Sequence, residues 1–211
     1  MKNFLALDTS GNHLIVIAHK NGKTHSVFLP DCAMKHAVSI MPAVDEALKK
    51  AELTLAECDF FAAVVGAGSF TGIRIGISTV KGFCLAFNKP ALPITSFDLA
   101  AYNAIDDSSQ KKVLCLVDAL HDSYYVCGYE GEQVGYPPAY LSEEEVLELE
   151  AQGYALYACS ALPIGEKVRV KIVDPCKGLE KAAIALSEKG AFGDLVALYV
   201  RKSSAELNLG K

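Results

Sequence analysis

The sequence predicts an α/β protein built from two similar halves, on the basis of three observations. Short runs rich in β-branched and aromatic residues alternate with longer amphipathic segments, as strands alternate with helices. Each half opens with three predicted strands, a helix and another strand. The first strand of each half ends in an aspartate, Asp8 or Asp118. This shared order indicates an internal duplication, with residues 1–105 and 106–211 as the two halves and a cleft between them.

The first half combines a hairpin with three helices. The dipeptide Asn21-Gly22 lies between two strand-like runs and is a strong signal for a two-residue hairpin turn. Pro42 falls inside the first helical pattern, so we expect it to kink that helix or to mark its true start. The predicted strands are residues 4–9, 14–18, 24–29, 60–65 and 91–94, and the predicted helices are residues 33–51, 73–87 and 96–105.

The second half follows a polar run, residues 106–112, which is the predicted linker. Ser142 and Glu145 have the spacing of a capping box and predict the start of an acidic helix. We expect the tail, residues 194–211, to lie extended against the body. The predicted strands are residues 113–117, 124–129, 133–136, 155–159 and 168–173, and the predicted helices are residues 143–153 and 179–189.

Composition limits the classes of protein that this chain can belong to. No apolar run approaches the roughly 18 residues of a membrane span, and the N-terminus has the pattern of a strand rather than a signal peptide. The seven cysteines include no CxxC pair and indicate reduced core thiols in a cytoplasmic protein. The net charge of −5 argues against direct binding of nucleic acid by this chain alone.

A glycine-rich loop separates the predicted strand 60–65 from the helix that follows. Free backbone N–H groups at a helix start can bind an anion, but the alternative is a tight turn that lets helix and sheet pack closely. The loop lacks the Gly-Lys-Ser/Thr of a Walker A motif, the third glycine of a dinucleotide fingerprint and the glycines of a nucleophile elbow. The candidate loop residues are Gly66, Gly68, Ser69 and Thr71.

Small residues recur along the helix after this loop. Each glycine inside a helix costs roughly 1 kcal/mol relative to alanine, so Gly72, Gly76 and Gly82 need a reason. We expect another helix to approach this stripe, either the helix at 33–51 or a helix of another chain. The candidate partner-interface residues are His36, Ile40, Val44, Gly72, Ile75, Gly76 and Thr79.

No metal site and no self-sufficient catalytic group of residues is predicted. The histidines show no HExxH or HxxxH spacing, and the hairpin turn places His19 opposite Thr24 with His25 on the other face. Asp8 and Asp118 could hold a metal–phosphate group, but two Asx turns that end strands are an equally good interpretation.

Four segments of the chain resemble the bacterial TsaB family, also called YeaZ. They are LALDTS, GAGSFTGIRIGISTVKG, PITSFDLAAY and LYVR, and they occur in the family's order over most of the chain. The resemblance implies the actin/sugar-kinase/Hsp70 type of fold, with two ribonuclease-H-like halves. It also implies a subunit without catalytic machinery, which pairs with the metal- and nucleotide-binding subunit TsaD and the ATPase TsaE. Together these proteins install threonylcarbamoyl on adenosine 37 of tRNA.

The resemblance therefore implies a non-catalytic scaffold or activator subunit that contacts tRNA only through the complex and can form a homodimer when alone. Two alternatives stay open: ATP or ADP with Mg²⁺ bound in the cleft near Asp8, Thr9, Ser10 and Asp118, or a peptidase-like hydrolase that uses Ser69. The chain departs from the family pattern at two places. Ala67 replaces a proline of the central loop, and the stretch 118–123 lacks the family's arginine and glutamate.

Overall fold

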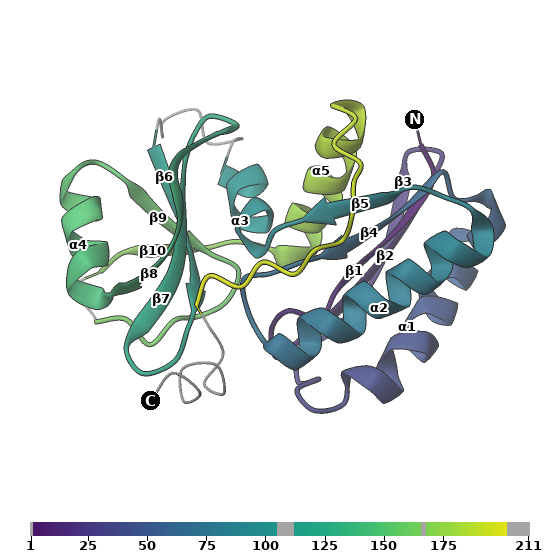
Figure 1. Ribbon diagram of the computed structural model, residues 1–211, viewed down its shortest axis with the longest axis horizontal. Helices are drawn as coiled ribbons and strands as arrows, with labels where there is room; N and C mark the ends of the chain where they lie inside the picture. Colours follow the sequence, from purple (N-terminus) through teal and green to yellow (C-terminus); the bar gives the residue numbers. More distant parts are fainter. Residues whose placement is uncertain (1, 105–111, 166–167, 202–211) are drawn as a thin grey trace.

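The computed structural model describes residues 2–104, 112–165 and 168–201 (Figure 1). The first sheet comprises β1 (Phe4–Asp8), β2 (Leu14–Lys20), β3 (Lys23–Leu29), β4 (Phe60–Val64) and β5 (Ala91–Ile94). The second sheet comprises β6 (Lys112–Asp118), β7 (Ser123–Glu130), β8 (Gln133–Ser142), β9 (Ala155–Ala158) and β10 (Val170–Ile172). The helices are α1 (His36–Ala51), α2 (Phe70–Phe87), α3 (Ser96–Ala104), α4 (Glu143–Ala151) and α5 (Pro175–Glu188), with a short 3₁₀ helix, η1 (Leu55–Glu57).

The two sheets have the same strand order. The first is β3-β2-β1-β4-β5, and the second, read from its β8 edge, is β8-β7-β6-β9-β10. In each sheet the first three strands of the sequence form an antiparallel meander. The fourth strand pairs in parallel with the first. This repeat confirms two ribonuclease-H-like halves and the actin/sugar-kinase/Hsp70 type of α/β fold. The predicted register of the first hairpin, with His19 opposite Thr24, is also confirmed.

The helices form layers on both sheets (Figure 1). α1 and α2 cover one face of the first sheet, and α5 covers the other. α3 packs against α5 and against the second sheet, whose far face is covered by α4. Because α3 and α5 lie between the two sheets, the central region that the sequence predicts as a cleft contains packed helices.

The three inner strands of the first sheet, β1, β2 and β4, are buried on both faces. Leu5 and Leu7 pack into the core under α1 and α2, whereas Phe4 and Ala6 face α5. Alternate residues of β1 therefore enter different cores, which explains why the strand is a continuous apolar run rather than an alternating one.

The division at residue 105 separates the sheets but not all the helices. α5 belongs to the second half of the sequence and returns to pack on the first sheet, where Leu179 and Ala182 join the core around Phe4. Phe192, which follows α5, meets Phe60 edge-on at a centroid distance of 5.4 Å. The first sheet is thus completed by the C-terminal part of the chain.

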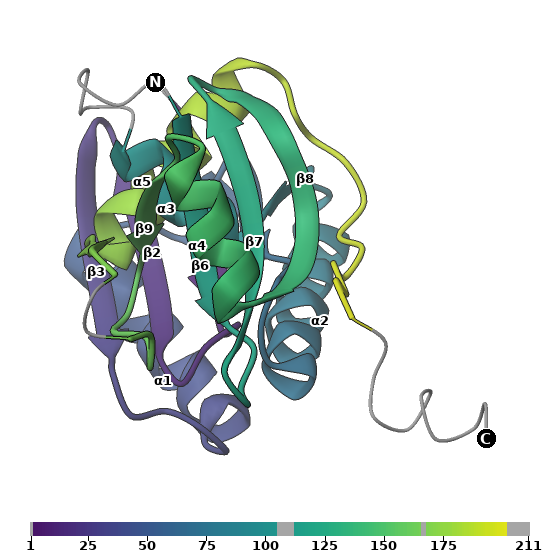
Figure 2. The same cartoon turned by 90° about the vertical axis from the view of Figure 1, so that its left-hand side faces the viewer.

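Residues 193–201 form an extended segment, which we call the C-terminal strap. It runs from the end of α5 along the first sheet and past α2 to the second half (Figures 1 and 2). Leu195 is buried, and the amide of Leu198 donates a 2.7 Å hydrogen bond to the carbonyl oxygen of Val65. The predicted extended tail is confirmed for residues 194–201, and residues 202–211 lie outside the described residues.

Several predicted boundaries are wrong. α2 begins at Phe70 and α5 at Pro175, three and four residues earlier than predicted, because Ser69 and Asp174 cap them. α1 begins at His36 and continues through Pro42, which does not mark its start. β8 extends to Ser142, beyond the predicted residue 136. The predicted linker lies outside the described residues, except for Lys112, which begins β6.

By length and mean hydropathy alone α2 could cross a membrane, although Arg74 and Lys81 interrupt its apolar sequence, in keeping with the expectation that the chain has no long apolar run. Its inner face, including Ile73, Ile77 and Val80, packs into the core on the first sheet. About a third of the helix (33%) is buried in this way.

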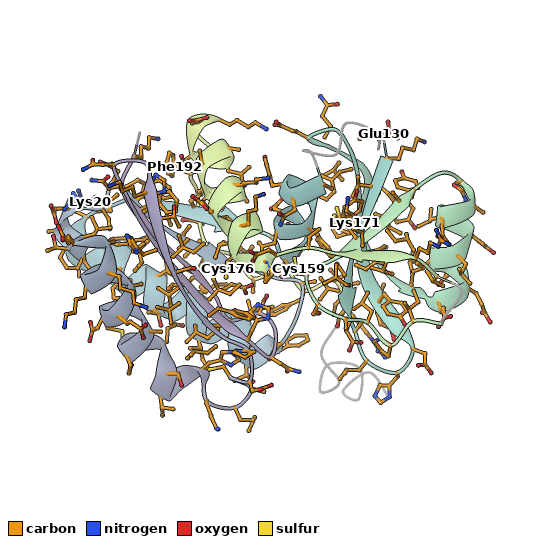
Figure 3. All side chains as sticks on the ribbon, turned by 180° about the vertical axis from the view of Figure 1, so that it is seen from behind. Lys20, Glu130, Cys159, Lys171, Cys176 and Phe192 are labelled. Carbon is orange, nitrogen blue, oxygen red and sulfur yellow. The ribbon has the colours of Figure 1, made fainter. Side chains whose placement is uncertain are left out.

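The cysteines are free thiols. Cys159 and Cys176 lie where the two halves meet (Figure 3), and both pack against the core around Phe4. Burial raises the pKa of Cys159 to about 12 and that of Cys176 to about 11. These thiols are therefore protonated near neutral pH, as expected for structural rather than reactive cysteines.

Candidate functional site

The Asp8–Ser10 turn and the glycine loop, far apart in the sequence, are packed together. The amide of Ser69 donates a 2.7 Å hydrogen bond to the carbonyl oxygen of Ser10. The hydroxyl of Thr9 donates a 2.7 Å hydrogen bond to the carbonyl oxygen of Gly72. Ser96, at the start of α3, completes the network by bonding to Ala67 O at 2.6 Å and to Ser10 Oγ at 3.1 Å.

The glycines of the loop permit this close approach. A Cβ on Gly68 would lie 2.2 Å from the carbonyl oxygen of Ser10, and a Cβ on Gly72 would lie 2.0 Å from that of Thr9. Both distances are far below contact distance and involve backbone atoms, so a side chain is excluded at either position. The geometry favours the packing interpretation of the loop over an open anion cradle, because the turn occupies the space beside the glycines.

The same contacts correct the prediction for the small-residue stripe of α2. Gly72 and Gly76 face Thr9 rather than another helix, and a Cβ on Gly76 would lie 2.5 Å from Thr9 Oγ1. Gly82 is different, since a Cβ there would meet nothing within 4 Å. Two of the three glycines are thus explained by the turn after β1, and the third has no contact that requires it.

Asp8 is buried, and each of its two carboxylate oxygens has a hydrogen-bond partner. Its Oδ1 accepts from the amide of Ser10 at 2.8 Å, and its Oδ2 lies 2.9 Å from Nε2 of His13. Burial alone would raise the pKa of Asp8, but His13 and Ser10 outweigh it and lower the pKa. Burial would likewise lower the pKa of His13, but the hydrogen bond and charge of Asp8 raise it. The two groups therefore form an ion pair.

The candidate nucleotide residues do not present a free surface. Asp8, Thr9 and Ser10 are only 1%, 1% and 5% exposed, and both carboxylate oxygens of Asp8 already accept hydrogen bonds. Asp118 accepts a 2.8 Å hydrogen bond from the amide of Leu120, which is the Asx-turn geometry. Among the described residues, no group of three or more His, Cys, Asp or Glu side chains could hold a metal ion. These residues do not fit a magnesium–nucleotide group.

Ser69 has a structural role at the start of α2. Its Oγ accepts a 3.2 Å hydrogen bond from the amide of Gly72, which satisfies one of the free donors of the helix. This capping explains the serine without a nucleophile.

Three of the predicted partner-interface residues of α1 point inward. His36 is 5% exposed and its Nε2 lies 2.9 Å from the carbonyl oxygen of His13. Ile40 and Val44 belong to the core between α1 and the first sheet. The helical period had located the apolar face of α1 correctly, but the protein's own sheet covers most of it.

A groove between α1 and α2 is the open part of this region, with a volume of about 540 Å³. Met41, which lines the groove, is 44% exposed, and Val38, three residues before it on α1, is 74% exposed. Sequence reasoning missed Val38 and Met41, although their i, i+3 spacing makes them neighbours on the surface of one helix. The groove is lined by Ala37, Ile40, Met41, Thr71, Arg74, Ile75, Ser78 and Thr79.

Comparison with known proteins places the chain in a family. The family model described as "TsaD: tRNA N6-adenosine threonylcarbamoyltransferase" matches residues 19–187. The TsaB protein of Buchnera aphidicola subsp. Schizaphis graminum is 31% identical over 121 residues, which are 57% of this chain and 57% of that protein. The TsaB protein of Haemophilus influenzae is 30% identical over 132 residues, or 62% of this chain and 55% of that protein. The chain belongs to the TsaB/YeaZ branch of this family.

Solved structures support the TsaB/YeaZ fold. YeaZ from Pseudomonas aeruginosa superposes with a TM-score of 0.74 at 23% identity, covering 94% of this chain and all of that one. A second Pseudomonas aeruginosa structure, described as an uncharacterized protein with similarity to peptidase YEAZ, gives a TM-score of 0.78 at 24% identity, covering 95% and 100%. The sequence alignments, by contrast, span little more than half the length of the TsaB relatives named above.

Proposed function

We propose that this chain is a non-catalytic subunit in the biosynthesis of threonylcarbamoyladenosine in tRNA, where it binds and supports a TsaD-like catalytic subunit. Membership of the TsaB/YeaZ branch supports the pathway, because relatives in that branch are named for this biosynthesis. In this proposal the protein works in the cytoplasm beside a TsaE-like ATPase. The net charge of −5 supports contact with tRNA only through the complex.

The observation that carries the proposal is the groove between α1 and α2, together with exposed apolar side chains on α1. Val38 and Met41, three residues apart on α1, are 74% and 44% exposed, and Met34, before the start of the helix, is 99% exposed. Apolar side chains gathered beside a groove are typical of a protein interface. The closed packing of the Asp8–Ser10 turn on the glycine loop agrees with a supporting rather than a catalytic role.

Light scattering with the TsaD-like subunit of the same organism tests the proposal. We expect a 1:1 complex for the wild type, and loss of that complex when Val38→Glu places a charge among the exposed apolar side chains of α1. Val134→Glu is the matched control, since Val134 is 56% exposed on the edge strand β8 of the other half. Two unassociated wild-type proteins would overturn the proposal. The mass of the chain alone reports whether it also forms a homodimer.

An assay of threonylcarbamoyl transfer tests the supporting role. The TsaD-like subunit with the ATPase, tRNA and the threonylcarbamoyl donor should be active only when this chain is present. Ser69→Ala should retain that activity, because Ser69 acts as a helix cap. Full activity without this chain would remove the supporting role. Loss of activity in a correctly folded Ser69→Ala protein would point to catalysis by Ser69 instead.

A further inference from the structure

Two helices form a seam between the two halves of the structure, one half built on each sheet. α3 packs on the second sheet, where Phe97 enters the core and Asp98 accepts a 2.9 Å hydrogen bond from the hydroxyl of Tyr129. α5 packs on the first sheet. The two helices approach closely, since a Cβ on Gly178 of α5 would lie 2.1 Å from the carbonyl oxygen of Leu99 on α3. We call this contact the α3–α5 seam (Figure 1).

A seam between two helices does not by itself fix the angle between the bodies that carry them. Packed helices slide and turn past each other by small shifts, and relative motion is the default for two bodies unless their contact is large and apolar. The α3–α5 seam is partly polar, because the side-chain amide of Asn103 donates a 2.8 Å hydrogen bond to the carbonyl oxygen of Asp174. The freedom of the halves to turn therefore depends on contacts outside the seam.

Residues 189–201 supply such contacts, and we call them the brace. The brace begins at Lys189, which ends α5, and continues through the C-terminal strap. Its middle part is fixed to the first sheet. The amide of Gly193 donates a 3.0 Å hydrogen bond to the carbonyl oxygen of Ala91, and Leu195 is buried in the core under α1 and α2. Both ends of the brace reach the other half.

One end of the brace holds the turn of the β7–β8 hairpin. The ammonium group of Lys189 forms an ion pair with Glu132, which lies in that turn. The same group lies 5.8 Å from the ring centroid of Tyr102 on α3, which is within cation–π distance. Lys189 therefore links the end of α5 to two elements across the seam.

The other end of the brace holds a distant part of the same hairpin. Nη1 of Arg201 donates a 3.0 Å hydrogen bond to the hydroxyl of Tyr140 on β8, and the guanidinium carbon lies 4.7 Å from the centroid of that ring. Tyr140 is eight positions after Glu132, or roughly 25 Å along an extended strand. Two contacts so far apart resist rotation better than either alone, because a turn about one of them displaces the other.

We propose that the brace fixes the angle between the two halves, and that releasing both of its ends lets the halves turn about the α3–α5 seam. The proposal concerns this chain alone and does not rest on the proposed function. Salt weakens one end of the brace, because the Lys189 and Glu132 side chains are 48% and 45% exposed. Arg201 binds a neutral partner, so the other end is much less sensitive to salt.

Double electron–electron resonance between two nitroxides tests the proposal. The labels are attached to p-acetylphenylalanine in place of Asp45 on α1 and Glu148 on α4, two exposed positions in different halves, so that the native cysteines stay unlabelled. We expect one narrow distance distribution with the intact brace, and a distribution at least two-fold broader in the double variant Lys189→Ala/Arg201→Ala. Lys50→Ala is the matched control, because it removes an ion pair that lies within α1.

Charge reversal separates a specific brace from a general loss of stability. Glu132→Lys should broaden the distribution, and adding Lys189→Glu should narrow it again, because the ion pair is restored with the opposite polarity. Raising NaCl from about 50 mM to about 500 mM should broaden the distribution of Arg201→Ala more than that of the wild type, since its brace depends on the ion pair at the other end.

The outcomes decide between the brace and the seam. An unchanged distribution in a folded double variant would overturn the proposal and show that the α3–α5 seam alone fixes the angle. A charge reversal that leaves the distribution broad would overturn the role of Lys189. If the double variant loses its cooperative thermal transition, Glu132→Gln with Tyr140→Phe replaces it, because these changes remove only the charge at one end and the hydroxyl at the other. An unchanged distribution in that milder variant would equally overturn the proposal.

Discussion

The buried carboxylate of Asp8 and the imidazole of His13 lie 2.9 Å apart, Oδ2 to Nε2, at the turn on which the glycine loop packs. The carbonyl oxygen of His13 in turn contacts His36 at the start of α1. This ion pair thus joins the end of β1 to the first helix through one short segment. It is a local pairing, five residues apart, that the search for metal and catalytic spacings did not predict.

Removal of His13 should destabilise the protein in a pH-dependent way. His13→Ala leaves the buried carboxylate of Asp8 without its charged partner, at a cost of about 3 kcal/mol. The pKa of His13 is raised in the folded state, so its contribution is complete below pH 6.5 and is lost as pH rises through the folded pKa. The pKa of Asp8 is lowered, so its contribution is complete above pH 3.8 and is lost as pH falls through the folded pKa.

The free energy of unfolding in urea, measured from pH 3 to pH 9 for both proteins, checks this expectation. The deficit of His13→Ala should be largest between about pH 4 and pH 6.5 and should shrink toward either end of the range. His121→Asn is the control, because His121 is exposed and its φ of 54° suits asparagine. A deficit that is constant with pH would show that His13 contributes packing rather than charge.

The same substitution at two glycines of α2 should have opposite effects. Gly72→Ala forces a Cβ to within 2.0 Å of the Thr9 carbonyl oxygen, and the resulting backbone shift should cost about 3 kcal/mol or more. Gly82→Ala meets nothing within 4 Å and should stabilise the helix by about 0.5–1 kcal/mol. Urea unfolding of the two variants decides the matter. Equal effects would mean that helix propensity, not the contact with Thr9, governs both positions.

Some of the fold could be predicted from local sequence and some could not. The hairpin at Asn21-Gly22 and the cap at Ser142 depend on neighbouring residues, and both are confirmed. The starts of α2 and α5 were missed because the capping residues and first turns lie outside the apolar period. The role of Gly72 depends on Thr9, 63 residues away, and no local pattern indicates that contact.

The candidate interface shows the same limit. The helical period identified the apolar face of α1 with Ile40 and Val44, but period alone does not say whether a sheet of the same chain or a partner covers that face. In the structure the sheet covers it, and the exposed Val38 and Met41 lie beside it. Exposed apolar residues beside the buried face of α1, such as Val38, therefore indicate a surface that another protein could cover better than the residues of the buried face do.

His19 should make the protein sensitive to acid. Thr24 donates to Glu180 and accepts from Nδ1 of His19 at 2.7 Å, which leaves the buried Nε2 without a hydrogen-bond partner. The ring also stacks on Phe4, with centroids 4.8 Å apart. Burial lowers the pKa of His19, so the unfolded chain takes up a proton first and stability is lost as pH falls below 6.5.

His19→Phe removes this proton uptake while keeping the ring. The thermal midpoint of the wild type should fall more between pH 8 and pH 5 than that of the variant, with other titrating groups common to both. At pH 8 the two should differ by no more than about 1 kcal/mol, the value of one hydrogen bond. Parallel acid profiles would mean that folding does not lower the pKa of His19.

The C-terminal strap should be fastened by Tyr199. Its ring stacks on Phe70 with centroids 4.4 Å apart, and its hydroxyl accepts the hydrogen bond from Arg74. Tyr199→Phe keeps the stacking and should cost about 1 kcal/mol, whereas Tyr199→Ala loses both contacts and should cost about 2 kcal/mol. Hydrogen exchange at the amide of Leu198, which donates to Val65, reports local release of the strap. Exchange should be faster in Tyr199→Ala than in Tyr199→Phe, and identical rates in the two variants and the wild type would show that the strap is held by Leu195 and its core contacts instead.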